Sequence, residues 1–196
     1  MIVILDYGMG NIRSVSRALT RLNAEHVVQE TLEGADKLII PGVGAFGAAM
    51  VRLEPLREKI LAFAAEGNPL LGICLGQQLL FDRSEEMGEH IGFGLIPGAV
   101  HYLSPDAGVK VPHMGWSPIE PVGGHPVAEG VKAGDQVYFV HSLITECEDH
   151  ADVAAWAEYG SRFAAMVQRG SVWGTQFHPE KSGDIGLRIL ENFIAC

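Results

Sequence analysis

Three side chains have types and spacing suited to covalent chemistry, and the first of them is Cys74. Cys74 follows the apolar run 70–73, with Gly72 two residues before it and Gly76 two residues after it. This pattern predicts a buried strand that turns sharply into a helix over 75–82, since glycine lets neighbouring backbone approach a strained turn. The N–H groups at the start of such a helix favour a thiolate. A buried structural cysteine fits the same pattern, because cysteine is often buried.

The other two side chains are His178 and Glu180, which stand on either side of Pro179. Proline disfavours helical backbone at the residue before it, so we expect His178 to be extended, and side chains two apart on an extended segment point to the same side. Glu180 can then accept a hydrogen bond from one imidazole nitrogen while the other faces Cys74, as in a nucleophile, base and orienting acid. Without Cys74, a histidine at a strand end beside a solvated glutamate is the simpler interpretation.

A carbonyl under attack also needs N–H donors. The apolar run 37–40 predicts a buried strand, and it ends in a glycine-rich loop that contains Gly44. The N–H groups of Gly44 and Leu75 are therefore candidates for an oxyanion hole. An ordinary loop at a strand end is the alternative.

These motifs carry a resemblance to a known family. The segments GICLGQQ at 72–78 and HPE at 178–180 resemble the signature of class I, or triad, glutamine amidotransferases. Longer motifs are similar to the glutaminase subunit of imidazole glycerol phosphate synthase, the HisH family: DYGMGN at 6–11, PGVGAFG at 41–47, KVPHMGW at 110–116 and GTQFHPEKS at 174–182. The matches cover nearly the whole chain.

The resemblance implies a role for each matching residue. Cys74 would attack the side-chain amide of L-glutamine, His178 would protonate the departing ammonia and then activate water, and Glu180 would orient His178. The implied substrate-binding residues are Gln78, Glu86, which would reach the α-ammonium group, and Ser142, which would contact the α-carboxylate region. No cofactor and no metal are implied.

The resemblance also implies a partner, a cyclase subunit with a (β/α)8 barrel that forms a heterodimer with this chain. The cyclase would use the ammonia to convert a ribotide into imidazole glycerol phosphate and AICAR. We further expect weak glutamine hydrolysis by the chain alone, raised by the partner through reorientation of the peptide between Val43 and Gly44, which glycine makes easy.

Two positions depart from the family pattern. Leu143 stands where the family often has an aromatic residue, so no contact of that aromatic side chain is carried over. Gln77 stands where methionine is usual, and we expect it to face away from the chemistry.

Composition narrows the class of protein. The chain has 196 residues, of which 47% are hydrophobic, enough for one core, and we expect a single domain over 1–196. Fourteen basic and 24 acidic residues give a net charge of −10, which argues against a nucleic-acid surface and against a polybasic membrane patch. Three widely spaced cysteines and the absence of a signal or membrane-spanning segment in the sequence predict a cytoplasmic protein.

The apolar pattern predicts an α/β fold with an open, mostly parallel sheet, helices on both faces and antiparallel additions in the second half. In the first half, we expect strands over 2–5, 26–29, 37–40 and 70–73, and helices over 11–22 and 46–65. In the second half, we expect strands over 100–103, 136–140, 152–157, 162–167 and 172–177, and a closing helix after Ser182.

Two other sets of residues suggest sites that we reject. Gly8-x-Gly10 follows a strand, but Arg13 replaces the third glycine of a dinucleotide-binding turn. His113, His141 and His178 do not have the spacing of zinc ligands. We expect His113 to lie on the partner-facing surface or in a satisfied polar site.

Two other functions remain open. The chain could serve another acceptor, as the glutaminase subunit of a different amidotransferase or as a free-standing cysteine hydrolase. It could also be a binding module with a dead site, although the intact Cys74, His178 and Glu180 argue against that.

Overall fold

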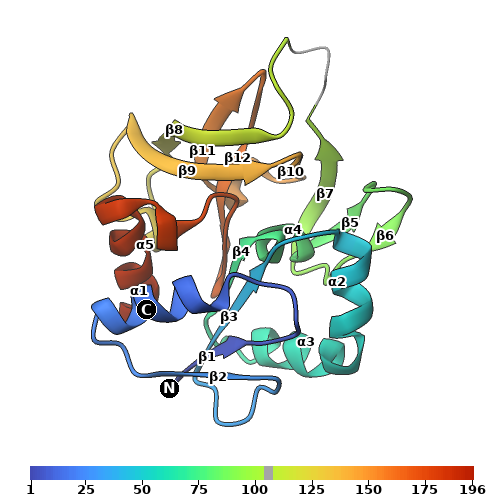
Figure 1. The fold of residues 1–196 in the computed structure, drawn as a ribbon, viewed down its shortest axis with the longest axis vertical. Helices are drawn as coiled ribbons and strands as arrows, with labels where there is room; N and C mark the ends of the chain where they lie inside the picture. Colours follow the sequence, from blue (N-terminus) through green and yellow to red (C-terminus); the bar gives the residue numbers. More distant parts are fainter. Residues whose placement is uncertain (104–107) are drawn as a thin grey trace.

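The computed structural model describes residues 1–103 and 108–196, and it contains two sheets (Figure 1). The larger sheet has nine described strands in the order β2-β1-β3-β4-β13-β12-β11-β8-β9. The smaller sheet has four, in the order β10-β7-β5-β6. Both sheets meet at the end of β9, where a single residue, Ser142, separates β9 from β10.

One half of the large sheet is parallel and the other half is antiparallel. The parallel strands are β2 (His26–Gln29), β1 (Ile2–Leu5), β3 (Lys37–Gly42), β4 (Leu70–Cys74) and β13 (Val172–Thr175). The antiparallel strands are β12 (Ser161–Arg169), β11 (Val153–Tyr159), β8 (His113–Pro121) and β9 (Asp135–His141). This arrangement matches the predicted fold class.

Helices cover both faces of the parallel half because its strands are apolar on both sides. Along β1, Ile2 and Ile4 pack with α1 (Ile12–Arg21) and α5 (Gly183–Ala195). The alternate residues Val3 and Leu5 pack with α2 (Phe46–Leu53), α3 (Arg57–Ala65) and α4 (Leu75–Leu79). The period of two residues in a strand therefore divides the core into two layers.

The small sheet packs on the same side as α2, α3 and α4, since Val100 and Leu143 share their apolar cluster. Its strands are β10 (Leu143–Cys147), β7 (Ile96–Tyr102), β5 (Phe81–Ser84) and β6 (His90–Ile91). Short 3-10 turns complete the described chain at Glu54–Leu56, Pro126–Ala128, His150–Asp152 and Pro179–Lys181.

The structure corrects several predicted boundaries. The helix expected over 75–82 ends at Leu79, because the returning chain uses the carbonyls of Leu79 and Leu80 to bind the N–H groups of Phe93 and Leu95. The helix expected over 46–65 is interrupted by a 3-10 turn at Pro55, which has no N–H to donate. The strand expected over 172–177 ends at Thr175, and the one expected over 100–103 begins at Ile96 and ends at Tyr102.

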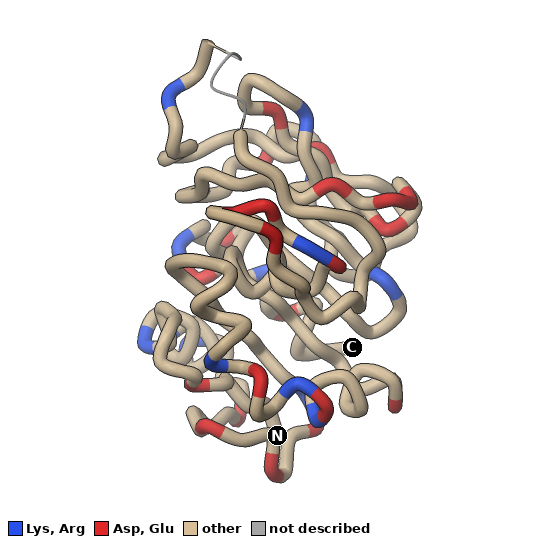
Figure 2. The backbone as a smooth tube through the Cα atoms, turned by 90° about the vertical axis from the view of Figure 1, so that its right-hand side faces the viewer, with Lys and Arg blue, Asp and Glu red and all other residues tan. Residues whose placement is uncertain are grey.

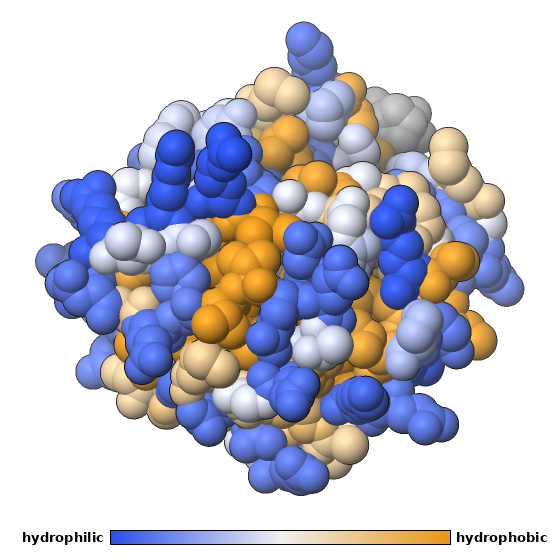
Figure 3. All heavy atoms as spheres, turned by 60° about the horizontal axis from the view of Figure 1, so that its bottom comes forward, coloured by the Kyte–Doolittle hydropathy of each residue, from blue (hydrophilic) through white to orange (hydrophobic). Residues whose placement is uncertain are grey.

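The surface carries charges of both signs. Figure 2 shows acidic and basic residues interspersed along the backbone. Apolar residues also reach the surface between hydrophilic ones, as Figure 3 shows for the lower face of the molecule. In the part of the chain that the structure describes, no helix combines the length and apolar character needed to cross a membrane.

Candidate active site

Cys74 is held in a strained conformation at the carboxyl end of β4. Its φ of 57° lies in the left-handed region, which costs a residue with a side chain on the order of 1–3 kcal/mol. The backbone around Cys74 is packed too closely for a side chain at either neighbouring glycine. A Cβ on Gly72 would lie 2.4 Å from the carbonyl oxygen of Gly76, and a Cβ on Gly76 would lie 1.8 Å from that of Ile40. The two glycines are therefore required for the turn that presents the thiol.

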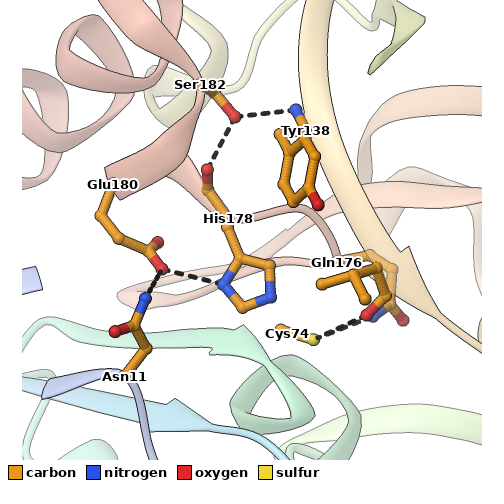
Figure 4. Close-up of polar contacts among 8 residues, drawn as sticks. Asn11, Cys74, Tyr138, Gln176, His178, Glu180 and Ser182 are labelled. Carbon is orange, nitrogen blue, oxygen red and sulfur yellow. Dashed lines mark hydrogen bonds and ion pairs between the residues drawn. The ribbon is translucent and has the colours of Figure 1, made fainter. Parts of the chain in front are cut away.

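His178 and Glu180 form a direct hydrogen bond, with 2.9 Å between Nδ1 of His178 and Oε1 of Glu180. Both side chains are buried. His178 is extended, as expected, but Glu180 lies in a 3-10 turn rather than on an extended segment. Asn11 Nδ2 donates to the same oxygen of Glu180 at 3.1 Å, so the carboxylate is held from a second side (Figure 4).

The backbone of His178 is also fixed. Its N–H donates to the carbonyl of Tyr138 at 3.0 Å, and its carbonyl accepts from Ser182 Oγ at 2.7 Å. Ser182 Oγ in turn accepts from the N–H of Tyr138 at 2.9 Å. These bonds tie the segment after β13 to β9, which places the imidazole ring between Glu180 and Cys74 (Figure 4).

The charge state of His178 follows from its neighbours. Burial acts to lower the pKa of His178, but the thiolate of Cys74 and the carboxylate of Glu180 outweigh it and raise the pKa to about 9. Nε2 is buried and has no hydrogen-bond partner among residues 1–103 and 108–196. At neutral pH, His178 is therefore protonated, and its Nε2–H has no acceptor among the described residues.

Gln176 is a neighbour of Cys74 that the sequence did not single out. Its Nε2 lies 3.9 Å from Sγ of Cys74, and its Oε1 accepts from Gln78 Nε2 at 3.1 Å. The carbonyl oxygen of Val140 lies 3.8 Å from the same sulfur. Gln176, Asn11 and Ser182 all belong to motifs of the family resemblance, which was the available signal for them.

Cys74 opens into a cavity of about 330 Å³, within the range of small-molecule sites. The predicted residues that line it are Gly44, Cys74, Leu75, Gln78, Glu86 and Ser142. Val43, Pro112, Val140, His141 and Leu143 complete the lining. His178 and Glu180 are absent from this lining, and the His178 ring lies between Glu180 and Cys74 (Figure 4). The structure thus brings together residues from five separate segments of the chain.

The two candidate oxyanion donors line the same cavity as Cys74. Leu75 is the first residue of α4, and Gly44 has a φ of 107°, which favours glycine. The loop before Gly44 packs tightly on the Cys74 turn, since a Cβ on Gly42 would lie 2.7 Å from the hydroxyl of Tyr7 and 2.8 Å from Cβ of Leu75. These contacts hold the loop and the turn at a fixed separation.

The predicted substrate-binding residues have partners of their own. The Glu86 carboxylate accepts from the N–H of Phe46 at the start of α2. Gln78 Nε2 also donates to the carbonyl of Leu143, at 3.5 Å. Ser142 is half-buried at the junction of the two sheets. All three residues line the cavity.

The two departures from the family pattern have different surroundings. Leu143 is 7% exposed and lines the cavity, so a change there alters the pocket itself. Gln77 is buried on the other side of α4, where its Nε2 donates to Thr145 Oγ1 at 2.9 Å and to the carbonyl of Ala164 at 3.2 Å. The expectation that Gln77 faces away from the chemistry is confirmed.

His113 and His141 form a buried pair joined by a hydrogen bond. Nδ1 of His113 lies 3.0 Å from Nε2 of His141. Within residues 1–103 and 108–196, no group of three or more His, Cys, Asp or Glu side chains is placed to hold a metal ion. His113 is 1% exposed, so the satisfied polar site is the correct alternative and the partner-facing surface is wrong.

Comparison with known proteins agrees with this geometry. Residues 3–196 match the family model described as glutamine amidotransferase class-I. The chain is 48% identical to the imidazole glycerol phosphate synthase subunit HisH of Syntrophotalea carbinolica, over 98% of both chains. It is 45% identical to the HisH subunit of Natronomonas pharaonis, over 98% of this chain and 93% of that one. The chain belongs to the HisH family of class I glutamine amidotransferases.

Solved structures related to this HisH-family chain share its fold. A glutamine amidotransferase structure matches with a TM-score of 0.76 at 22% identity, over 98% of both chains. The structure of PurLQS from Thermotoga maritima also matches with a TM-score of 0.76, at 20% identity, over 99% of this chain and 97% of that one. Fold class and enzyme class are therefore as the sequence predicted: the chain is a glutamine amidotransferase.

Proposed function

We propose that this chain hydrolyses L-glutamine through Cys74, His178 and Glu180 and supplies the ammonia to an imidazole glycerol phosphate synthase of histidine biosynthesis. One observation carries the proposal. His178 is bonded to Glu180 at 2.9 Å on one side and faces the strained Cys74 on the other, and Cys74 itself lines a cavity together with Gln78, Glu86 and Ser142.

The first half of the reaction forms a thioester. Sulfur of Cys74 attacks the side-chain carbonyl carbon of glutamine, and the N–H groups of Gly44 and Leu75 receive the developing oxyanion. His178 then gives its proton to the amide nitrogen, the carbon–nitrogen bond breaks, and ammonia leaves. Glu180 stabilises the imidazolium and keeps its ring in place.

The second half regenerates the enzyme. Neutral His178 takes a proton from water as that water attacks the thioester carbon. The carbon–sulfur bond breaks, and the product leaves as glutamate after its new carboxyl group releases a proton to solvent. Cys74 is again a thiolate beside a protonated His178. Gln78, Glu86 and Ser142 hold the substrate through this cycle, with Glu86 on the α-ammonium group.

The proposed recipient of the ammonia is a cyclase subunit with a (β/α)8 barrel, in a heterodimer with this chain. The related proteins are named as subunits of imidazole glycerol phosphate synthase, which supports a partner subunit, and the barrel is what the family resemblance implies. A surface for it is the outer face of β8, where Met114 and Trp116 are 63% and 55% exposed, close to Pro112 at the cavity. There the ammonia would convert the ribotide into imidazole glycerol phosphate and AICAR.

We also propose that the partner controls hydrolysis through the peptide between Val43 and Gly44. Support comes from the position of this peptide at the cavity, from the positive φ of Gly44 and from the 43% exposure of Val43. A reoriented peptide would turn the Gly44 N–H toward the substrate carbonyl. The chain alone would then hydrolyse glutamine slowly.

A cytoplasmic location and a single domain over 1–196 complete the proposal. All three cysteines, Cys74, Cys147 and Cys196, are free thiols, as a reducing compartment favours.

Glutamate release from glutamine tests the function, with the chain alone and with a cyclase subunit and its ribotide. We expect strong stimulation by the partner and no hydrolysis by Cys74→Ala under either condition. Fast hydrolysis without a partner would instead indicate a free-standing hydrolase. Hydrolysis that the cyclase does not stimulate but another synthase does would indicate a different acceptor.

A further inference from the structure

Two buried histidines next to the cavity take no part in the proposed reaction. His113 on β8 and His141 on β9 are directly opposite each other, and they are 1% and 6% exposed. Aromatic rings enclose them. The ring centroid of His113 lies 3.9 Å from that of Tyr159 and 4.7 Å from that of Phe139, both stacked. The ring of Phe163 meets His141 edge-on, with 5.1 Å between centroids. A buried polar pair of this kind is costly unless all of its hydrogen bonds are made.

The hydrogen bonds of the pair fix the position of each proton. Nδ1 of His141 lies 2.7 Å from the carbonyl oxygen of Leu143, which can only accept, so Nδ1 carries a proton. Nε2 of neutral His141 must then accept from Nδ1 of His113, at 3.0 Å. Nε2 of His113 must accept from the hydroxyl of Ser117, at 2.8 Å.

Burial keeps both rings neutral, as this order of protons requires. It lowers the pKa of His113 to about 4 and the pKa of His141 to about 3. At neutral pH, each hydrogen bond between Ser117 and Leu143 is therefore donated in the same direction, toward Leu143. Every ring nitrogen of the two histidines has a partner.

The hydrogen bond from His141 Nδ1 to the carbonyl of Leu143 spans the junction between the two sheets. β9 ends at His141 and β10 begins at Leu143, so only Ser142 connects them. Residues 140–143 all line the cavity, and the carbonyl of Val140 lies 3.8 Å from the sulfur of Cys74. The backbone of the junction thus sets the position of one wall of the pocket relative to the thiol.

We propose that His113 and His141 are positioning residues, whose hydrogen bonds hold the Ser142 junction in the geometry that binds glutamine. This inference rests on the proposed function for the identity of the substrate. The pair contacts neither Cys74 nor His178 through a hydrogen bond between described residues, so it acts through the pocket wall and not on the reacting atoms.

Two substitutions at one position separate the bonds. His141→Asn keeps a donor near the position of Nδ1, so the bond to Leu143 can form while the bond to His113 is lost. His141→Gln keeps a polar group near the position of Nε2 and loses the bond to Leu143. We expect KM for glutamine in the partner-activated enzyme to rise about fivefold to tenfold in His141→Gln and less in His141→Asn, with kcat changed less than KM.

His150→Gln is the matched control. His150 is an exposed histidine outside the cavity lining, so we expect KM and kcat to remain unchanged. If His141→Gln has the KM of the wild type, or loses only kcat or thermal stability, the inference is wrong. A wild-type enzyme that hydrolyses no glutamine with the cyclase would overturn the proposed function and the inference with it.

The unsubstituted chain provides an independent test by nitrogen NMR of labelled histidine at pH 7. We expect His113 and His141 in the Nδ1–H form, in addition to His26, whose Nδ1 lies 2.9 Å from the carbonyl oxygen of Ala24. A neutral imidazole in water favours Nε2–H. One of these signals should disappear in His113→Phe, which keeps an aromatic ring for stacking. Nε2–H forms or protonated rings at both positions would overturn the assignment.

Discussion

Two buried histidine sites at the same end of the sheet have opposite charge states. The neighbours of His178 are the sulfur of Cys74 and the carboxylate of Glu180, and its pKa is raised to about 9. The neighbours of His141 are a carbonyl and another neutral imidazole, and its pKa is lowered to about 3. Burial acts in the same direction at both sites. The difference shows that anionic partners, rather than depth, decide which histidine can donate a proton.

The largest expected effect comes from removing the thiol. Cys74→Ala should reduce glutamine hydrolysis by about 10⁴-fold or more, since the nucleophile is lost. It also removes one of the two negative charges beside His178. The pKa of His178 should therefore fall from about 9 toward the lowered pKa of His141. Glutamate release and an NMR titration of His178 measure the two effects. An unchanged titration would mean that Cys74 is not the anion that His178 faces.

Glu180→Gln tests the second anion. The amide oxygen can still accept from Nδ1, but the charge is lost, so we expect kcat to fall by about 10³-fold and the pKa of His178 to decrease. Asn11→Ala is the comparison, because it removes only the neutral bond to Glu180 and should cost about tenfold or less. Equal losses in the two variants would show that the geometry at Glu180 matters and its charge does not.

The pH dependence of stability should show both histidine sites. His113 and His141 have lowered pKa values in the folded chain, so the unfolded chain binds more protons below pH 6.5, and stability is lost as pH falls from 6.5 toward 4. His178 has a raised pKa, so its contribution is present below pH 6.5 and is lost as pH rises toward 9. Denaturant unfolding at a series of pH values measures the free energy of unfolding on the acid limb, below pH 6.5, and on the alkaline limb, above it.

Removal of the buried pair separates the two limbs. In a His113→Phe, His141→Asn double variant, the loss on the acid side should become shallower while the loss on the alkaline side stays. An acid limb as steep as that of the wild type would mean that other groups cause it.

The smallest expected effect is at the outer end of the buried pair. Ser117→Ala leaves Nε2 of His113 without its donor, but Ser117 is half-buried and water can replace the hydroxyl. We expect a loss of about 1 kcal/mol in the free energy of unfolding and an unchanged pKa of His178. Ser171→Ala, at a half-buried serine before β13, is the control for loss of a hydroxyl. A shift in the titration of His178 would show that the two sites are coupled.

The parallel half of the fold could be predicted because its signals are local. Short apolar runs alternate with helical stretches, and all four strands expected between residues 2 and 73 are present. The strands β5, β6, β8 and β10 were not predicted. In β8, exposed Met114 and Trp116 alternate with a buried histidine and a glycine, so the strand has no apolar face that a sequence pattern can detect.

The residues of the proposed triad, their order along the chain and the glycines around Cys74 could all be read from the sequence, because a strained turn needs glycine at fixed positions. The long-range contacts of Asn11, Gln176 and Ser182 and the pairing of His113 with His141 could not. Asn11 with Glu180, Gln176 with Gln78, Ser182 with Tyr138 and His113 with His141 join segments whose separation along the chain carries no period or spacing rule. They depend on the register of β8 with β9 and on where the chain passes from one sheet to the other, which packing of the whole chain determines.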